Sequence, residues 1–207
     1  YNRKANRMLI SIFRDIQKIN EKDLYKETGS YFKSLINTFT HIIKTDIYFF
    51  SILRKYSNKA VIANEEILTY LNDNFLFNKP IDANLDTLFD TRKKLDDIII
   101  DIINTIDDYN VIMKIDFADD MVKKPIYHII MHELNHNTHH RGEISAMLDM
   151  MGYINDYSNL ITIKELQDKY SMKPVYSKYN TYIILRVYCK GHSINYIISY
   201  KNWNFLN

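Results

Sequence analysis

Residues 125–152, which read PIYHIIMHELNHNTHHRGEISAMLDMMG, decide the fold that we expect for this chain. The segment opens on Pro125, and proline is well tolerated in the first turn of a helix because its missing N–H has no helical partner there. It closes on Gly152, a residue type that commonly follows the last helical turn. The segment also holds five of the seven histidines of the chain. The sequence therefore predicts one long helix that carries a histidine cluster, formed by His128, His132, His136, His139 and His140.

The spacing within the cluster favours a metal site. Residues four apart on a helix are neighbours on one face, so His136 and His140 can share one metal ion through their imidazole nitrogens. Two side chains on one turn leave the coordination sphere open, so a further ligand must come from another helix. His139 points about 100° away from His140 around the helix axis, and we do not expect it to bind the same ion.

Three further helices are predicted from apolar residues at three- and four-residue spacings, over residues 2–19, 30–55 and 85–109. Ser30 is the expected N-cap of the second. A short helix is expected near residues 65–71 and another near 163–170, whereas residues 111–117 alternate like a short strand or an extended link. Only four glycines and three prolines occur, which is unusual for an all-β protein. The expected fold is all-α, with a short irregular or β-like C-terminal tail whose β-like runs are 182–188 and 194–200.

The composition excludes several classes of protein. The 27 basic and 25 acidic residues are spread along the chain and give a net charge of +2, so no basic stripe for nucleic acid is expected. No apolar run approaches the roughly 20 residues of a membrane span. The single cysteine, Cys189, cannot form an internal disulfide. We expect a cytoplasmic protein, and we expect acidic pairs such as Asp96 and Asp97 to lie on solvated helix faces.

Two interpretations of the histidines compete. Residues 132–136 spell the pattern H-E-x-x-H, which in zinc peptidases supplies two ligands, His132 and His136, and a general base, Glu133. The longer form of that motif needs glycine at position 139 and histidine at position 142, and this chain has the reverse. Replacing His132 or His140 with alanine separates the two interpretations, because each replacement removes a ligand in only one of them.

The second interpretation rests on a longer match. Residues 136–143, HNTHHRGE, resemble the H-x-x-H-H-R-G-[QE] signature of the DinB/YfiT-like family of metal-binding four-helix bundles, and an apolar stretch and Gly152 follow, as in that family. Two other segments resemble the family in the right order: residues 1–6, YNRKAN, and residues 37–41, NTFTH, followed by Asp46 and Tyr48. The resemblance covers residues 1–165, which we expect to be a DinB-like four-helix bundle, and leaves a C-terminal extension at 166–207.

The resemblance implies a site and an activity. It makes His41, His136 and His140 the ligands of a divalent ion, zinc or nickel first and manganese or iron next, with open positions for water or substrate. Family members of known activity are thiol-dependent, so it also implies a metal-dependent S-transferase, or a related hydrolase or isomerase. Such an enzyme would use a low-molecular-weight thiol, such as bacillithiol or mycothiol, and an electrophilic small molecule, and it would be a homodimer. A non-catalytic, metal-stabilised dimeric interaction module is the other alternative.

The positions of several residues near the histidine cluster suggest what their side chains do. Glu133 could orient a ligand, act as a base, or be a solvated helix charge. His132 and Tyr48 are expected to line the pocket or to contact the ligands. Gly142 lies inside the predicted helix, where glycine costs about 1 kcal/mol relative to alanine. We therefore expect a close approach of another helix at that position.

Overall fold

The computed structural model describes the chain except residues 58–63, 118–119, 157–174, 177–180, 190–191 and 200–207. The contacts divide the chain into two units, Tyr1–Ser158 and Asn159–Asn207. The boundary expected at residue 165 and the short helix expected at 163–170 lie outside the described residues. No helix of the described residues is long and apolar enough to cross a membrane.

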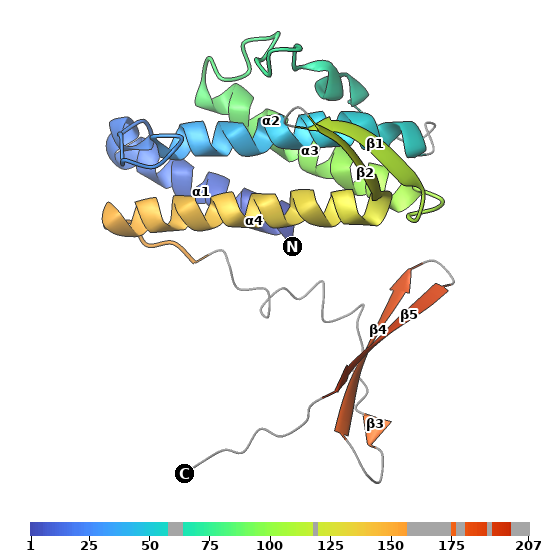
Figure 1. Cartoon of the computed structure of the whole chain (residues 1–207). Helices are drawn as coiled ribbons and strands as arrows, with labels where there is room; N and C mark the ends of the chain where they lie inside the picture. Colours follow the sequence, from blue (N-terminus) through green and yellow to red (C-terminus); the bar gives the residue numbers. More distant parts are fainter. Residues whose placement is uncertain (58–63, 118–119, 157–174, 177–180, 190–191, 200–207) are drawn as a thin grey trace, which may run out of the picture. The chain divides into compact units, whose positions relative to one another are not determined.

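The first unit is mostly helical. Its long helices are α1 (Asn2–Asn20), α2 (Leu35–Leu53), α3 (Leu85–Thr105) and α4 (Ile126–Met150), and they run side by side (Figure 1). Helix α2 packs against α3 and α4, and α1 packs against the same two helices, so each helix has two helical neighbours. Helices α2, α3 and α4 lie within the predicted segments, and α1 ends one residue beyond its predicted segment, at Asn20.

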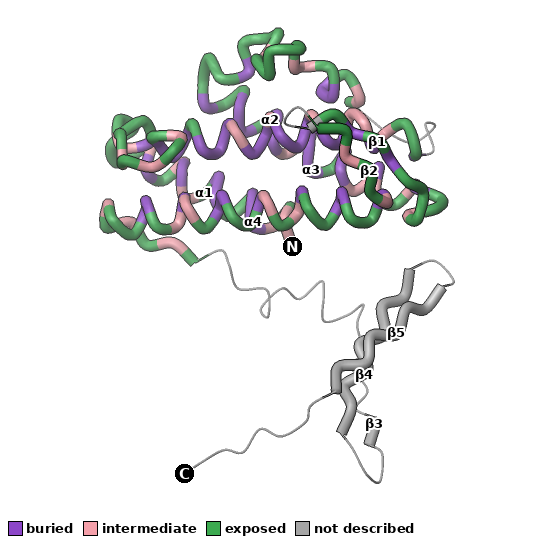
Figure 2. Tube along the Cα trace, in the orientation of Figure 1, coloured by how far each residue is buried: buried purple, intermediate pink, exposed green. Residues whose placement is uncertain are grey.

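The core forms where the apolar faces of these helices meet, and Figure 2 shows the buried residues facing the space between the helices. Phe13 of α1, Phe39 of α2 and Phe89 of α3 meet there with ring centroids 5.4–6.1 Å apart. All three side chains are buried. Rings at these distances add to the stability that burial of their apolar surface supplies.

The second helix begins later than predicted. Ser34, not Ser30, is its N-cap, because the Ser34 hydroxyl accepts the backbone N–H of Asn37 at 3.3 Å. The residues before it form a turn in which Gly29 and Lys33 have left-handed backbone conformations, with φ of 76° and 71°. Two positive φ angles within five residues cannot belong to a right-handed helix.

A β-hairpin precedes α4 and departs from the all-α expectation. Strand β1 (Ile112–Phe117) pairs antiparallel with β2 (Asp120–Pro125), with Ile115 opposite Val122. The alternation at 111–117 predicts β1, but β2 was not foreseen because its exposed lysines and its proline carry little strand signal. Pro125 is the N-cap residue of α4, one position before the helix.

Short elements complete the description. Among the described residues, three 3₁₀ turns lie between the helices: η1 (Glu21–Leu24), η2 (Arg54–Tyr56) and η4 (Glu65–Thr69), the last within the short helix predicted near 65–71. In the second unit, β3 (Val175–Tyr176), β4 (Thr181–Cys189) and β5 (His192–Ser199) form an antiparallel sheet in that order. The two longer strands confirm the predicted β-like runs.

Candidate metal centre

Three histidines from two helices converge on one point. The Nε2 atom of His136 lies 3.3 Å from Nε2 of His41 on α2 and 2.9 Å from Nε2 of His140, one turn further along α4. All three rings offer a nitrogen within 4.8 Å of the other two. Helices α2 and α4 pack together here, so the structure brings together the three residues that the resemblance named as ligands.

The donor set suits a divalent cation. Three imidazole nitrogens that face one another cannot all donate and accept in pairs, because a neutral imidazole has one N–H and one lone pair. A cation at their centre would satisfy all three lone pairs at once. Three neutral imidazoles also match the ligand type that zinc and nickel accept.

The surroundings keep two of these rings neutral. Burial, together with the positive charges that His140 and His136 would carry, lowers the pKa of His41 to about 4. Burial, followed by the charge of His140, likewise lowers the pKa of His136 to about 4. Neutral rings leave their lone pairs free for a metal ion at pH 7.

A carboxylate on the same helix orients His140. Oε2 of Glu143 lies 2.7 Å from Nδ1 of His140, and Oε1 lies 3.3 Å from Nε2 of His139. The first contact places a proton on Nδ1 of His140 and leaves Nε2 free to face the other two ligands. His139 is exposed, which agrees with its exclusion as a ligand of this site. Sequence reasoning missed Glu143. Its position, three residues after His140 and four after His139, could have indicated that its carboxylate contacts both rings.

A second set of candidate ligands lies on α4 itself. His139, His140 and Glu143 lie close enough together to hold a cation. However, the carboxylate between the two rings already accounts for that closeness, through its hydrogen bond with His140 and its ion-pair contact with His139. In the set of His41, His136 and His140, the Nε2 atom of His136 meets the Nε2 atoms of both other rings, although a ring nitrogen carries only one N–H or one lone pair.

Glu133 is buried, so its interpretation as a solvated helix charge is wrong. Its Oε1 atom lies 3.9 Å from Nδ1 of His136. Burial, together with the negative charge of the nearby Asp46, raises the pKa of Glu133 to about 9. Glu133 approaches the Nδ1 side of the His136 ring, whereas His41 and His140 face its Nε2 atom; at 3.9 Å the carboxyl group and the ring form no hydrogen bond.

A pocket of about 380 Å³ opens beside the histidines. His132 lines it, with its ring 6.2 Å from that of His136, and so does Tyr48, whose hydroxyl donates to the carbonyl of Asp116 at 2.8 Å. His132 is not in either set of candidate ligands among the described residues. Sequence reasoning missed two lining residues that come from outside the helices, Phe75 and Asp116.

A network of buried polar side chains lies behind the centre. Arg92 of α3 forms ion pairs with Asp46 and Asp96, and Asn137 donates to Asp46 at 2.9 Å. Asn6 of α1 donates to Asp96 at 2.9 Å. The expectation that Asp96 is solvated is wrong, because its side chain is buried. The guanidinium of Arg92 and the amide of Asn6 compensate for the hydration that the carboxylate loses.

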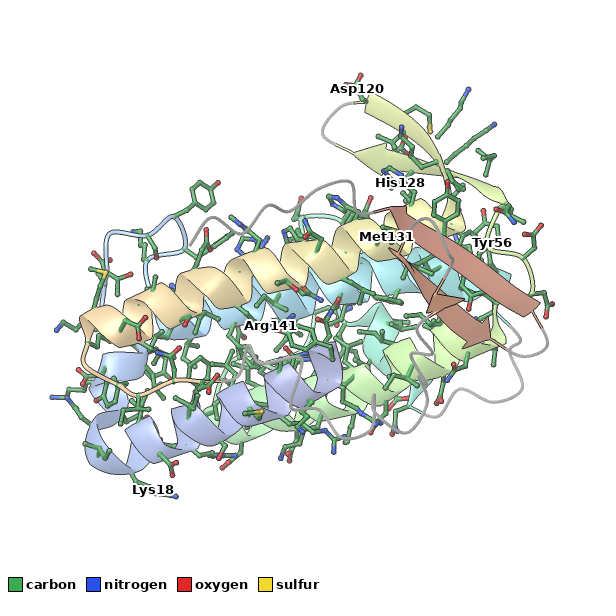
Figure 3. All side chains as sticks on the ribbon, turned by 90° about the horizontal axis from the view of Figure 1, so that it is seen from below. Lys18, Tyr56, Asp120, His128, Met131 and Arg141 are labelled. Atoms are coloured by element: carbon green, nitrogen blue, oxygen red, sulfur yellow. The ribbon has the colours of Figure 1, made fainter. Side chains whose placement is uncertain are left out.

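Arg141 joins this network to the start of the chain. Its guanidinium donates to the side-chain oxygens of Asn6, at 3.2 Å, and of Asn2. Figure 3 shows Arg141 among the helices, whereas Lys18 points outward. The three sequence segments that resemble the family are thus linked through buried contacts of their own residues.

Gly142 does not mark a close helix approach. A Cβ atom built at this position meets no other atom within 4 Å, and the residue is exposed. The expectation of tight packing here is therefore wrong, since α4 turns this face to solvent.

A mostly helical chain that gathers three histidines from two packed helices defines a class, that of helical proteins with a candidate metal site between helices. The comparisons place it more closely: the model of the DinB family matches residues 1–169, and the chain belongs to that family. No curated protein and no solved structure matches it.

Proposed function

We propose that this chain is a DinB-type four-helix bundle that binds a divalent metal ion through His41, His136 and His140. The observation that carries the proposal is the convergence of their three Nε2 atoms from α2 and α4. Zinc and nickel suit three neutral imidazoles best, with manganese and iron next.

We further propose that the centre serves a thiol S-transferase, or a related hydrolase or isomerase. A metal ion held by three side chains keeps open positions, and when bound it would lower the pKa of a thiol and so favour the nucleophilic thiolate. The residues around the histidines would position the metal ligands and the substrate. Glu143 holds His140, Glu133 faces His136, and the neighbouring pocket is large enough for a small molecule.

The peptidase alternative has less support from the geometry. His132 is exposed and lies outside both sets of candidate ligands among the described residues. Glu133 would have to reach a water molecule at the open side of the metal, yet it is buried on the Nδ1 side of His136.

Metal analysis of alanine variants tests the site. The purified protein is stripped with a chelator, reloaded with zinc or nickel, and assayed for bound metal beside H41A, H140A, H132A and H128A. We expect H41A and H140A to lose the metal, and H132A to keep it, as does H128A, the matched control on the exposed face of α4. Loss in H132A with retention in H140A would instead establish the peptidase arrangement.

A turnover assay tests the activity separately. The loaded protein is given bacillithiol or mycothiol with an electrophilic dye, and conjugate formation is followed. Conjugation that disappears in H41A supports the transferase. Retained metal without turnover of any thiol and electrophile pair would favour the non-catalytic interaction module, and sedimentation of the loaded protein then tests whether it is a dimer.

A further inference from the structure

The pocket beside the metal centre extends along α2. His41, Thr45 and Tyr48 all line it, and they lie on one face of the helix at positions i, i+4 and i+7. At a rise of 1.5 Å per residue, the seven residues from His41 to Tyr48 cover about 10 Å. A molecule in the pocket can therefore have one end at the metal centre and the other near Tyr48.

The end of the pocket near Tyr48 is aromatic. The ring of Tyr48 lies 5.2 Å from that of Phe49 and 6.2 Å from that of Phe75. The Phe75 ring also lies 6.5 Å from His41, so it spans both ends. We call this end, formed by Tyr48, Phe49, Phe75 and Asp116, the distal end.

The backbone holds Phe75 in an unfavourable conformation to place this ring. Its φ is +58°, in the left-handed region that a bulky side chain rarely adopts. A turn centred on Asn72 fixes it, because the N–H of Phe75 donates to the Asn72 carbonyl and the N–H of Leu76 to the Asn72 side chain, each at 3.0 Å. Such strain persists where the surroundings impose it, which is common at ligand sites.

The distal end carries one sign of charge. Asp116 is the only acidic residue among the described residues that line the pocket, and no lysine or arginine lines it with them. Lys44 of α2 does not line the pocket, and its ammonium lies 5.0 Å from the centroid of the Phe77 ring, although its charge still helps to lower the pKa of His41. Burial, followed by the negative charge of Asp116, raises the pKa of Tyr48, so the carboxylate lies near the aromatic rings. Aromatic faces near a carboxylate attract a cation and offer no partner to an anion.

We propose that the distal end binds a cationic amine on a ligand whose other end reaches the metal centre. The inference rests on the proposed function, since it assumes a metal held by the three histidines. It narrows the substrate class to amine-bearing molecules and disfavours ligands with a carboxylate at that end.

Three matched thiols test the proposal on the cobalt(II)-loaded protein. They are 6-amino-1-hexanethiol, 6-mercapto-1-hexanol and 6-mercaptohexanoate, which share a thiol for the metal and differ in the charge at the far end. Dissociation constants come from titrating the cobalt-to-thiolate absorption band. We expect the aminothiol to bind about two- to fivefold more tightly than the alcohol, and the acid to bind most weakly.

Two variants that each remove one negative charge test whether Asp116 causes the preference for the aminothiol. D116N should remove the preference for the aminothiol. D120N should keep it, because Asp120 lies at the tip of the same hairpin (Figure 3) and does not line the pocket. Equal binding of all three thiols, or a preference that survives in D116N, would overturn the proposal and leave the metal–thiol function standing. If no thiol changes the cobalt spectrum, the proposed function itself fails and this inference fails with it.

Discussion

Nδ1 of His140 lies 2.7 Å from Oε2 of Glu143, one turn further along α4. The contact fixes which ring nitrogen carries the proton, so Nε2 of the same ring can face His136 and His41. A carboxylate in this position also makes the imidazole more basic and therefore a better metal ligand.

Removing this carboxylate should weaken metal binding. We expect Glu143→Ala to lower the affinity for zinc about 10- to 100-fold, as loss of such outer partners commonly does. Glu143→Gln should lose less, since its amide oxygen still accepts a hydrogen bond. Competition with a chromophoric chelator measures both constants. Asp149→Asn, which removes a negative charge from an exposed position of the same helix, is the control and should bind zinc normally.

Replacing Gly142 with alanine should raise the free energy of unfolding. No neighbouring atom lies within 4 Å of the position that a Cβ would take, so Gly142→Ala should stabilise α4 by up to about 1 kcal/mol. For a domain of this size that corresponds to a rise in Tm of about 2–4 °C, measurable by circular dichroism. Gly152→Ala should do the opposite, because φ at Gly152 is +80° and alanine is strained there. A fall in Tm for Gly142→Ala would mean that this face of α4 is covered in solution.

The buried ion pairs should be sensitive to loss of their cation. Arg92→Met leaves Asp46 and Asp96 buried without their guanidinium, and we expect a loss of about 3–5 kcal/mol in the free energy of unfolding. Urea denaturation measures it. Asp97→Asn removes an exposed partner of Arg3 and Arg7 and should change the value by less than about 0.5 kcal/mol. Similar effects for the two variants would show that the Arg92 pairs are not buried in solution.

The two partly buried ligands should titrate at low pH. In the metal-free protein, the ring signals of His41 and His136 should move with midpoints near 4, as their lowered pKa values require, instead of near 6.5. The pH dependence of the imidazole C–H signals in proton NMR spectra, assigned with H41A and H136A, measures these midpoints. The unfolded chain takes up these protons first, so the contribution of the two residues to stability is present above pH 6.5 and is lost as the pH falls toward 4. Midpoints near 6.5 would show that the rings are solvated.

The helices and the histidine cluster on α4 could be anticipated because their signals are local or repeated. Apolar periodicity predicts three of the four long helices, Pro125 and Gly152 bound the fourth, and the spacing of His136 and His140 places them on one face. His41 is different, since no spacing connects it to residues almost a hundred positions later. Only the family resemblance pointed to it.

The remaining residues were missed for physical reasons that a sequence does not display. Asp96 looks solvated until the fold brings Asn6 of α1 beside it and Arg92 one turn away. Phe75 lies in a connection without periodicity, and its ring reaches the pocket through a left-handed turn. Such placements depend on tertiary contacts, which override local preference.

The buried carboxyl group of Glu133 should make the stability of the metal-free protein depend on pH in a way that glutamine abolishes. Because burial raises its pKa to about 9, the folded chain keeps the proton while the unfolded chain loses it above about 4.5. Over that interval the unfolded state binds fewer protons, so the contribution of Glu133 to stability falls as the pH rises. Glu133→Gln carries no such loss, and we expect its advantage in urea denaturation over the native protein to grow from pH 5 to pH 9. Glu66→Gln, at an exposed position, should show no such trend. A constant difference between Glu133→Gln and the native protein would mean that Glu133 is already ionised in the folded state, and thus that its charge is compensated before any metal binds.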